Sequence, residues 1–190
     1  KSHKYGFSQR ITKEHGFYYC TDSFSNKLKN CDQSDKGCDQ FDKEIKHGKW
    51  VEYYENGQLK YENNYNHGKR HGRSLYYDEK GYLLSSENYK NDYYHGMFKK
   101  YHGINGQLRR EGKFNENNHD STWTFYHQNG KVSKKQYYKL VRYWKDWMKG
   151  SNKIYYTEQR IGTWTTYDYE GNLVKEEIYK DGKLIETEEY

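Results

Sequence analysis

The sequence predicts an all-β protein, built as an elongated antiparallel sheet or solenoid of five to six stacked β-hairpins with one short helical insertion. The first observation behind this prediction is composition: the 190 residues include 24 Tyr, 7 Phe and 5 Trp, and neither Pro nor Ala. Aromatic residues suit strands, whereas a helical domain without alanine is disfavoured by helix propensity. The second observation is a motif that recurs five times along most of the chain.

Each copy of the motif starts with a Gly slot. An aromatic residue follows at +2, Tyr at +5, X-Gly at +8 and +9, Leu or Val at +11, and Tyr or Phe at +17. The first residues of the copies are Gly48, Gly72, Gly96, Ser121 and Gly162. Ser74 replaces the aromatic residue of the second copy, Ser121 replaces Gly, and the third copy carries one inserted residue before Asn105-Gly106. A fixed period of this length is typical of repeat architectures.

Within a copy, two aromatic-rich runs flank the X-Gly pair, which predicts a hairpin closed by a two-residue type I′ turn. In the first copy the turn is Asn56-Gly57, and it places Tyr54 opposite Leu59. Alternation along the strands then puts Leu59 on the face of Trp50 and puts Tyr53 on the other face. A single hairpin cannot bury its apolar face, so the copies are expected to stack into a ribbon without a deep cavity.

The full pattern is G-x-W-x-x-Y-Y-x-N-G-x-L-x-x-E-x-x-Y-x-x-G, and it extends over residues 47–184 apart from the insertion. It resembles the MORN-repeat variant common in bacterial proteins, including a group described as toxin–antitoxin-type antitoxins. The resemblance implies an open sheet of hairpins that is used for binding and has no catalytic centre. It does not imply a particular toxin.

We divide the chain into an N-terminal cap (1–46), four repeats (47–138), the insertion (139–160), and a fifth repeat with a C-terminal extension (161–190). The cap is interpreted as a degenerate hairpin with its turn at Ser25-Asn26, followed by a solvated loop. This register places Cys20 opposite Cys31 and predicts a disulfide between them. The alternative is that both, like Cys38, are reduced in an intracellular cap. The cysteines lack paired CxxC spacing, which argues against structural zinc.

The tyrosines of the +5 slot are the first candidate for partner binding, because Tyr is an effective anchor at protein interfaces. They are predicted to lie on the face opposite the tryptophans: Tyr53, Tyr77, Tyr101, Tyr126 and Tyr167. The alternative is that each Tyr packs along its neighbour and merely covers the sheet.

The insertion is the second candidate. Its apolar residues recur at helical spacing and predict an amphipathic helix ended by Gly150: Leu140, Val141, Trp144, Trp147 and Met148. It is also basic, so its apolar face is expected to cover the sheet, dock on a partner or lie on an anionic membrane surface. The residues proposed for partner contact are Arg142, Trp144, Lys145 and Trp147.

Metal and catalytic chemistry are disfavoured. His47, His71 and His95 share the slot before Gly, but equivalent residues lie two strands apart, about 9–10 Å, too far to share one zinc ion. Turn hydrogen bonding or an exposed, pH-sensitive charge is the preferred role. The sequence lacks GxSxG, HExxH, P-loop and dinucleotide-binding motifs. We therefore expect no enzyme activity, no metal and no cofactor.

These features together predict a non-enzymatic protein-binding module, antitoxin-like or immunity-like, that sterically occludes a partner such as a toxin or effector. A surface scaffold, or a membrane- or glycan-binding aromatic repeat, is the alternative. Nucleic acid is disfavoured because charges alternate in sign outside the insertion. No stretch has the length and apolarity of a membrane span. The chain begins at Lys1 rather than Met, so we expect a trimmed or processed form, with export favoured over the cytoplasm. The oligomeric state stays open because sheet edges can pair with another chain.

Overall fold

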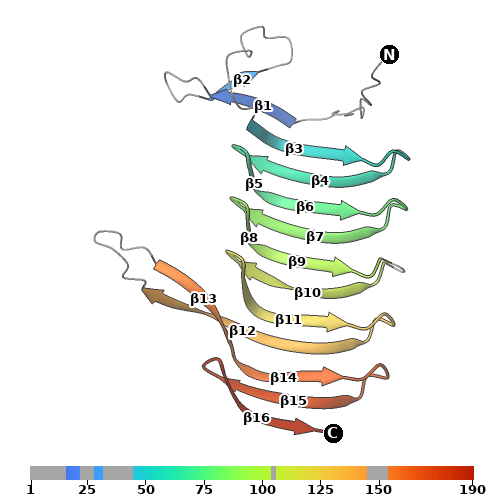
Figure 1. Ribbon diagram of the computed structural model, residues 1–190, viewed down its shortest axis with the longest axis vertical. Coiled ribbons are helices and arrows are strands. Elements are labelled where there is room, and N and C mark those ends of the chain that lie inside the picture. The colour runs from blue at the N-terminus through green and yellow to red at the C-terminus, as the bar shows by residue number, and fades with distance from the viewer. Residues whose placement is uncertain (1–15, 22–27, 32–44, 104–105, 145–153) are drawn as a thin grey trace, which may run out of the picture.

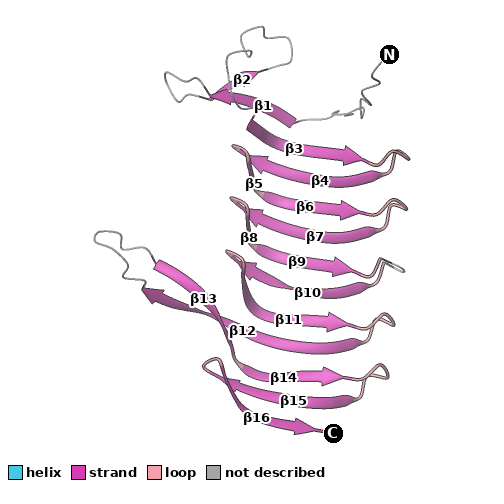
Figure 2. Cartoon of the chain, viewed as in Figure 1, coloured by secondary structure: helices cyan, strands magenta, loops and turns pink. Residues whose placement is uncertain are grey.

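The computed structural model describes residues 16–21, 28–31, 45–103, 106–144 and 154–190, and in this part of the chain it contains strands and no helix (Figures 1 and 2). All 16 described strands belong to one antiparallel sheet. The all-β prediction is confirmed, and so is the elongated sheet of stacked hairpins. The strands are β1 (Gly16–Thr21), β2 (Leu28–Cys31), β3 (Ile45–Tyr53), β4 (Leu59–Asn66), β5 (Lys69–Arg70), β6 (Gly72–Tyr77), β7 (Leu83–Lys90), β8 (Tyr93–Tyr94), β9 (Gly96–Tyr101), β10 (Leu108–Asn115), β11 (Asn118–Tyr126), β12 (Val132–Trp144), β13 (Ile154–Arg160), β14 (Gly162–Tyr167), β15 (Leu173–Lys180) and β16 (Lys183–Glu189).

The main path of the sheet follows chain order almost throughout, from β3 and β4 to β15 and β16. The short strands β5 and β8 pair with β4 and β7 at the inter-repeat turns, and β13 branches from β12. Within the described residues no second layer packs on either face (Figure 1). The described part of the chain is therefore a sheet of one layer.

The X-Gly turns differ from the predicted type I′ turn. The Gly57 amide donates to the Tyr54 carbonyl at 2.9 Å, and the Tyr54 amide donates to the Gln58 carbonyl at 2.8 Å. Of the pair Asn56-Gly57, only Gly57 has a positive φ, +84°. This geometry is a type I turn followed by a left-handed glycine with a bulge, which also requires X-Gly. The bulge shifts the register, so that Leu59 lies opposite Tyr53 and not opposite Tyr54.

Consecutive residues with positive φ, the mark of a type I′ turn, occur instead between the repeats. These turns are His67-Gly68, Asn91-Asp92, Glu116-Asn117 and Asp181-Gly182. Each turn donates an amide to a carbonyl of the preceding repeat, as Gly68 does to Lys46 at 2.7 Å and Asp92 to Arg70 at 2.9 Å. The inter-repeat turns thus connect one hairpin to the hairpin before it.

The buried core is a single column of rings on one face, which we call the tryptophan face because it carries the +2 residues Trp50, Ser74, Phe98, Trp123 and Trp164. Residues of the +17 slot lie beside them, and the residue two positions before the Gly slot fills the space between. Trp123 is fully buried, and its ring contacts Phe98, Phe114 and His119 at centroid distances of 4.5–5.8 Å. Aromatic burial along this column therefore holds successive repeats together.

The predicted helix over residues 139–160 is wrong. β12 continues to Trp144 and pairs with β13, from Tyr138 opposite Arg160 to Trp144 opposite Ile154. The two strands form a hairpin arm that projects from the array (Figure 1). Short apolar runs fit helical and strand periodicity alike, and β13 supplies the aromatic and β-branched partner that makes the strand preferable. Lys145, Trp147 and Gly150 lie outside the described residues.

The predicted register of the N-terminal hairpin is also wrong. Cys20 lies opposite Lys29, and Cys31 lies opposite Tyr18, so the two cysteines are diagonal neighbours. The predicted opposition of the two cysteines is therefore absent from the backbone register, and the disulfide between them stays a prediction. Cys38 lies outside the described residues.

Candidate protein-binding surface

Every +5 tyrosine lies on the face opposite the tryptophans, which we call the tyrosine face. In all five hairpins the register pairs this Tyr with the +11 aliphatic residue, which the sequence had placed with the tryptophans. The pairs form a line along the array that we call the tyrosine row: Tyr53–Leu59, Tyr77–Leu83, Tyr101–Leu108, Tyr126–Val132 and Tyr167–Leu173. The bulge explains the difference, because the extra residue turns the aliphatic side chain from the tryptophan face to the tyrosine face.

The tyrosine row is partly open to solvent. Tyr53 is 42% exposed, and the other four tyrosines are half-buried. Part of their function is structural, because the Tyr77 carbonyl accepts a 2.7 Å hydrogen bond from the Tyr54 hydroxyl of the preceding repeat. The Tyr167 carbonyl lies 3.1 Å from Nε2 of His127 in the same way. The +5 slot therefore joins neighbouring hairpins through its backbone and leaves its rings on the surface.

One tyrosine of the row belongs to a charged cluster. The Tyr126 hydroxyl donates to Glu111 at 2.8 Å, and Lys99 forms an ion pair with the same carboxylate at 3.1 Å. Partial burial and the Glu111 hydrogen bond raise the pKa of Tyr126 to about 12. Burial acts to raise the pKa of Glu111, but the hydrogen bonds from Tyr126 and Lys99 outweigh it and leave that pKa below its ordinary value. The cluster keeps Tyr126 neutral and Glu111 charged across the physiological range.

The projecting arm carries two of the other predicted partner contacts, Arg142 and Trp144. Arg142 of β12 is exposed, and Tyr156 of β13 is 45% exposed. Trp144 ends β12, and its backbone pairs with Ile154. The arm is tied to the array at its base, where Glu158 accepts a 2.6 Å hydrogen bond from the His119 amide and lies 2.7 Å from its Nδ1. The structure therefore places the arm and the tyrosine row on different parts of the molecule.

The histidines do not form a shared site. His71 Nδ1 lies 3.4 Å from Oδ1 of Asn91, and the His47 ring packs edge-on against His67. His119, one slot earlier than the others in its repeat, is part of the aromatic column. Among the described residues no group of three His, Cys, Asp or Glu side chains is placed to hold a metal ion.

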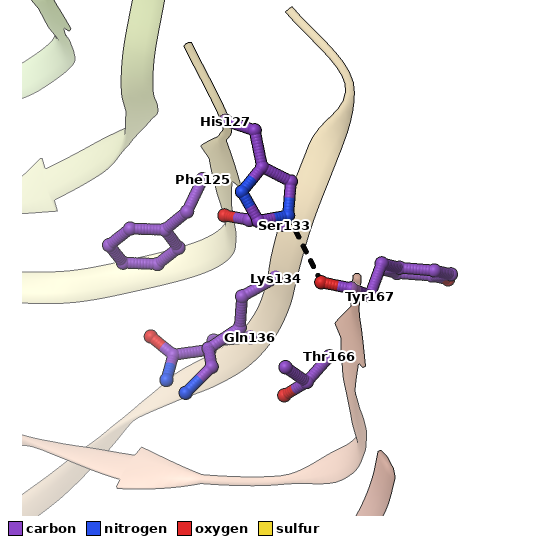
Figure 3. Close-up of a pocket in the computed structure, with 7 residues that line it drawn as sticks. All are labelled: Phe125, His127, Ser133, Lys134, Gln136, Thr166 and Tyr167. Atoms are coloured by element: carbon purple, nitrogen blue, oxygen red, sulfur yellow. Dashed lines mark hydrogen bonds between the residues drawn. The ribbon is translucent and has the colours of Figure 1, made fainter. Parts of the chain in front are cut away.

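A pocket of about 330 Å³ lies on the tryptophan face where the fourth repeat meets the fifth (Figure 3). Its lining combines the Phe125 ring with Lys134, Gln136 and two hydroxyl residues, Ser133 and Thr166. At the equivalent place between the first two repeats the large side chains of Tyr61 and Tyr76 lie opposite each other, with centroids 6.3 Å apart. Smaller side chains at this junction therefore leave the pocket, and the sequence analysis missed it because it depends on inter-repeat register.

Four segments match the model of the MORN repeat variant: residues 46–67, 70–91, 120–140 and 160–181. The copy that begins at Gly96 lies outside these matches, yet β9 and β10 form the same bulged hairpin as the others. MORN repeats generally mediate protein or membrane interactions and are not known as enzymes. The matches support the repeat and do not extend to the antitoxin group. No curated protein matches the chain.

The described part of the chain offers no helix with the length and apolarity needed to cross a membrane.

Proposed function

We propose that this protein is a non-enzymatic protein-binding module that holds its partner on the tyrosine face, through the tyrosine row. The observation that carries the proposal is the row itself, in which five tyrosines and five aliphatic residues follow one line on an uncovered sheet. Tyr supplies large, rigid contact area at low entropic cost, and for this reason it is enriched at interfaces.

The dimensions of the row suit a protein partner. It crosses ten strands from β3 to β15, which at about 4.8 Å per interval is about 43 Å. Each strand contributes one side chain to the row, so the row is about 7 Å wide, the spacing of same-face residues along a strand. It therefore offers about 300 Å², more than a third of one partner's share of a standard interface. Ion pairs flank it, Lys49 with Glu62 and Lys99 with Glu111, and supply the polar rim typical of such interfaces.

The mechanism we propose is steric occlusion. A rigid, one-layer sheet of this length can cover an active surface of a partner without contributing any chemistry. More specifically, we propose that the protein is antitoxin-like or immunity-like, that its partner is a toxin or effector, and that the β12–β13 arm makes a second contact with this partner. The arm favours this reading because it projects from the array with Arg142 and Tyr156 exposed. Membrane association, which MORN repeats also show, is the second candidate.

The test is affinity capture from lysate and envelope fractions of the source organism with three baits. These are the unmodified protein, a row variant (Tyr53→Ser with Tyr101→Ser), and a control variant (Tyr82→Ser with Tyr169→Ser). Tyr82 and Tyr169 are more exposed than the row tyrosines, 47% and 52%, but lie at hairpin turns outside the row. We expect one stoichiometric protein, reduced at least tenfold on the row variant and unchanged on the control.

Equal recovery on all three baits would contradict the tyrosine row as the site. A fourth bait, Trp144→Ala with Trp147→Ala, then asks whether the arm holds the partner. If no bait retains a protein and the unmodified chain co-sediments with anionic liposomes, the membrane reading replaces the protein-binding proposal.

A further inference from the structure

The tryptophan face carries a second row that the tyrosine row does not explain. Cross-strand pairs place a line of side chains directly opposite one another from β9 to β15, which we call the cationic row: Lys100, Arg110, Phe125, Lys134, Thr166 and Lys175. The order follows from the pairing register of six neighbouring strands. Four of its six members are basic.

Placing like charges next to each other is unfavourable for the sheet. Lys100 lies directly opposite Arg110, an arrangement that destabilises a strand pair. Arg110 stacks over the Phe98 ring at 5.2 Å and Lys175 forms an ion pair with Glu177 at 3.5 Å, but among the described residues neither Lys100 nor Lys134 has a carboxylate partner. Ion pairs elsewhere on this face show the usual remedy, since Lys60 pairs with Glu52 at 2.7 Å.

The neighbouring slot shows why the charge stays uncompensated. The residue opposite the +2 position is Glu87 in the second repeat and Glu177 in the fifth, but Gly112 and Gln136 in the third and fourth. Carboxylates are thus missing beside the cationic row at the two central repeats and present at the repeats on either side. The result is an electropositive strip of limited length.

The pocket described above lies on this strip (Figure 3). Lys134 reaches it together with the Gln136 amide and the hydroxyl groups of Ser133 and Thr166, while Phe125 forms an apolar wall. An ammonium group, an amide and hydroxyls in one hollow are donors that suit a carboxylate. The cationic row therefore has a concave place for an acidic group in addition to its charge.

The length of the strip selects among anionic ligands. From β9 to β15 it crosses five strand intervals, about 24 Å, which an extended peptide covers in about seven residues. At one end Glu189 lies directly opposite Lys175, and beyond Lys100 the line continues through the uncharged residues Ser85, Tyr76 and Tyr61. A membrane surface or a long nucleic acid would extend past the basic residues at both ends, whereas a short acidic segment matches their length.

We propose that the cationic row binds an acidic protein segment of about seven residues, with one carboxylate seated in the pocket at Lys134. The inference rests on the proposed function in one respect, that the module binds proteins, but it uses the opposite face and, apart from Tyr167, which also lines the pocket, different residues. A partner held by both rows would wrap one edge of the sheet, and a single-row partner would use one face only.

The experiment measures fluorescence anisotropy of a fluorescein-labelled octaglutamate peptide at low salt. The unmodified chain is compared with Lys100→Gln/Lys134→Gln and with a matched control, Lys90→Gln/Lys135→Gln. The control also removes two positive charges, but both of its lysines alternate to the tyrosine face, outside the cationic row. We expect the Kd for the peptide to rise at least tenfold in the first variant and less than twofold in the control, with affinity falling as salt is added.

A third variant, Ser133→Phe, fills the pocket without changing charge and is expected to weaken binding several-fold. Far-UV circular dichroism verifies that each variant keeps its sheet. Equal peptide affinity in all the proteins would overturn the proposal. So would tighter binding of vesicles with 30% phosphatidylserine, or of a 12-nucleotide oligo(dT), than of the peptide. We expect Lys100→Gln/Lys134→Gln to leave capture through the tyrosine row unchanged, so failure here and failure of the proposed function are distinguishable.

Discussion

Replacing Gly112 by Ala tests the aromatic column at its tightest contact. Gly112 lies in β10 opposite Phe98, directly under the ring of Trp123. A Cβ atom added here would lie 2.6 Å from Cγ of Trp123 and closer still to Cδ2 and Cε2, whereas ordinary contacts begin at 3.4 Å. The indole cannot move freely, because it is fully buried and its Nε1 donates to the Lys113 carbonyl at 3.1 Å.

The expected cost follows from these contacts. Overpacking a buried site costs about 1–3 kcal/mol, and loss of the indole hydrogen bond adds about 1 kcal/mol. Ala at a strand position without a steric conflict would instead gain about 0.4–1 kcal/mol through the unfolded chain. The net prediction for Gly112→Ala is a loss of about 2–3 kcal/mol in the free energy of unfolding.

Urea denaturation, followed by tryptophan fluorescence and circular dichroism, measures this loss. With a slope of about 2 kcal/mol per molar urea, the midpoint should fall by about 1 M. Gly103→Ala is the control, because the nearest atom its Cβ would meet among the described residues belongs to Leu84, at 3.7 Å, and its change should stay within about 0.5 kcal/mol. In a Trp123→Leu background the Gly112→Ala penalty should largely disappear. A Gly112→Ala protein as stable as the unmodified chain would refute the packing argument.

Two further predictions concern stability. Ser121 adopts φ +61° in a slot that holds glycine in the other repeats, so Ser121→Gly should stabilise the protein by about 1 kcal/mol. Gly162 adopts φ +64°, and no atom lies within 4 Å of a Cβ added to it, so Gly162→Ser should destabilise the protein by about the same amount. Thermal unfolding of the two variants measures both changes. A change of the same sign in both variants would contradict this backbone argument. The raised pKa of Tyr126 contributes stability that is fully present below its ordinary value of 10 and is lost as the pH rises through about 12. Tyr126→Phe should therefore be less stable by about 1 kcal/mol at pH 8, and the difference should vanish between pH 10 and pH 12, as urea midpoints across this range would show. A pH-independent difference would exclude the Glu111 hydrogen bond as its cause.

The sequence predicted the hairpins and their stacking because the aromatic slots at +2 and +17 and the turn glycines recur at a fixed period. It did not predict the turn class, since X-Gly serves both a type I turn with a bulge and a type I′ turn. Because of this ambiguity, the sequence analysis assigned Leu59 to the wrong face of the sheet, since a one-residue shift in register exchanges the two faces of a strand. The pairing of Tyr53 with Leu59 was hidden for this reason.

The prediction of a helix in the insertion failed for a different reason. Its apolar spacing satisfied a helix, but whether Val141 and Trp144 lie in a strand depends on a partner strand, Ile154–Arg160, that a local pattern does not include. The cationic row was missed because its members are far apart in sequence. Lys134 and Thr166 are 32 residues apart and meet only through the pairing of β12 with β14. Periodicity predicts elements well, whereas surfaces assembled across repeats require the register.

The central claim is that a partner protein lies on the tyrosine face, and site-specific photo-crosslinking tests it most directly. p-Benzoylphenylalanine would be placed at Tyr53 in the row, and at Tyr82, a turn residue of similar exposure, as the comparison. After irradiation in a lysate of the source organism, the account predicts one discrete protein adduct from Tyr53 and none from Tyr82. Adducts of equal yield from both positions, or an adduct from Tyr82 alone, would contradict it.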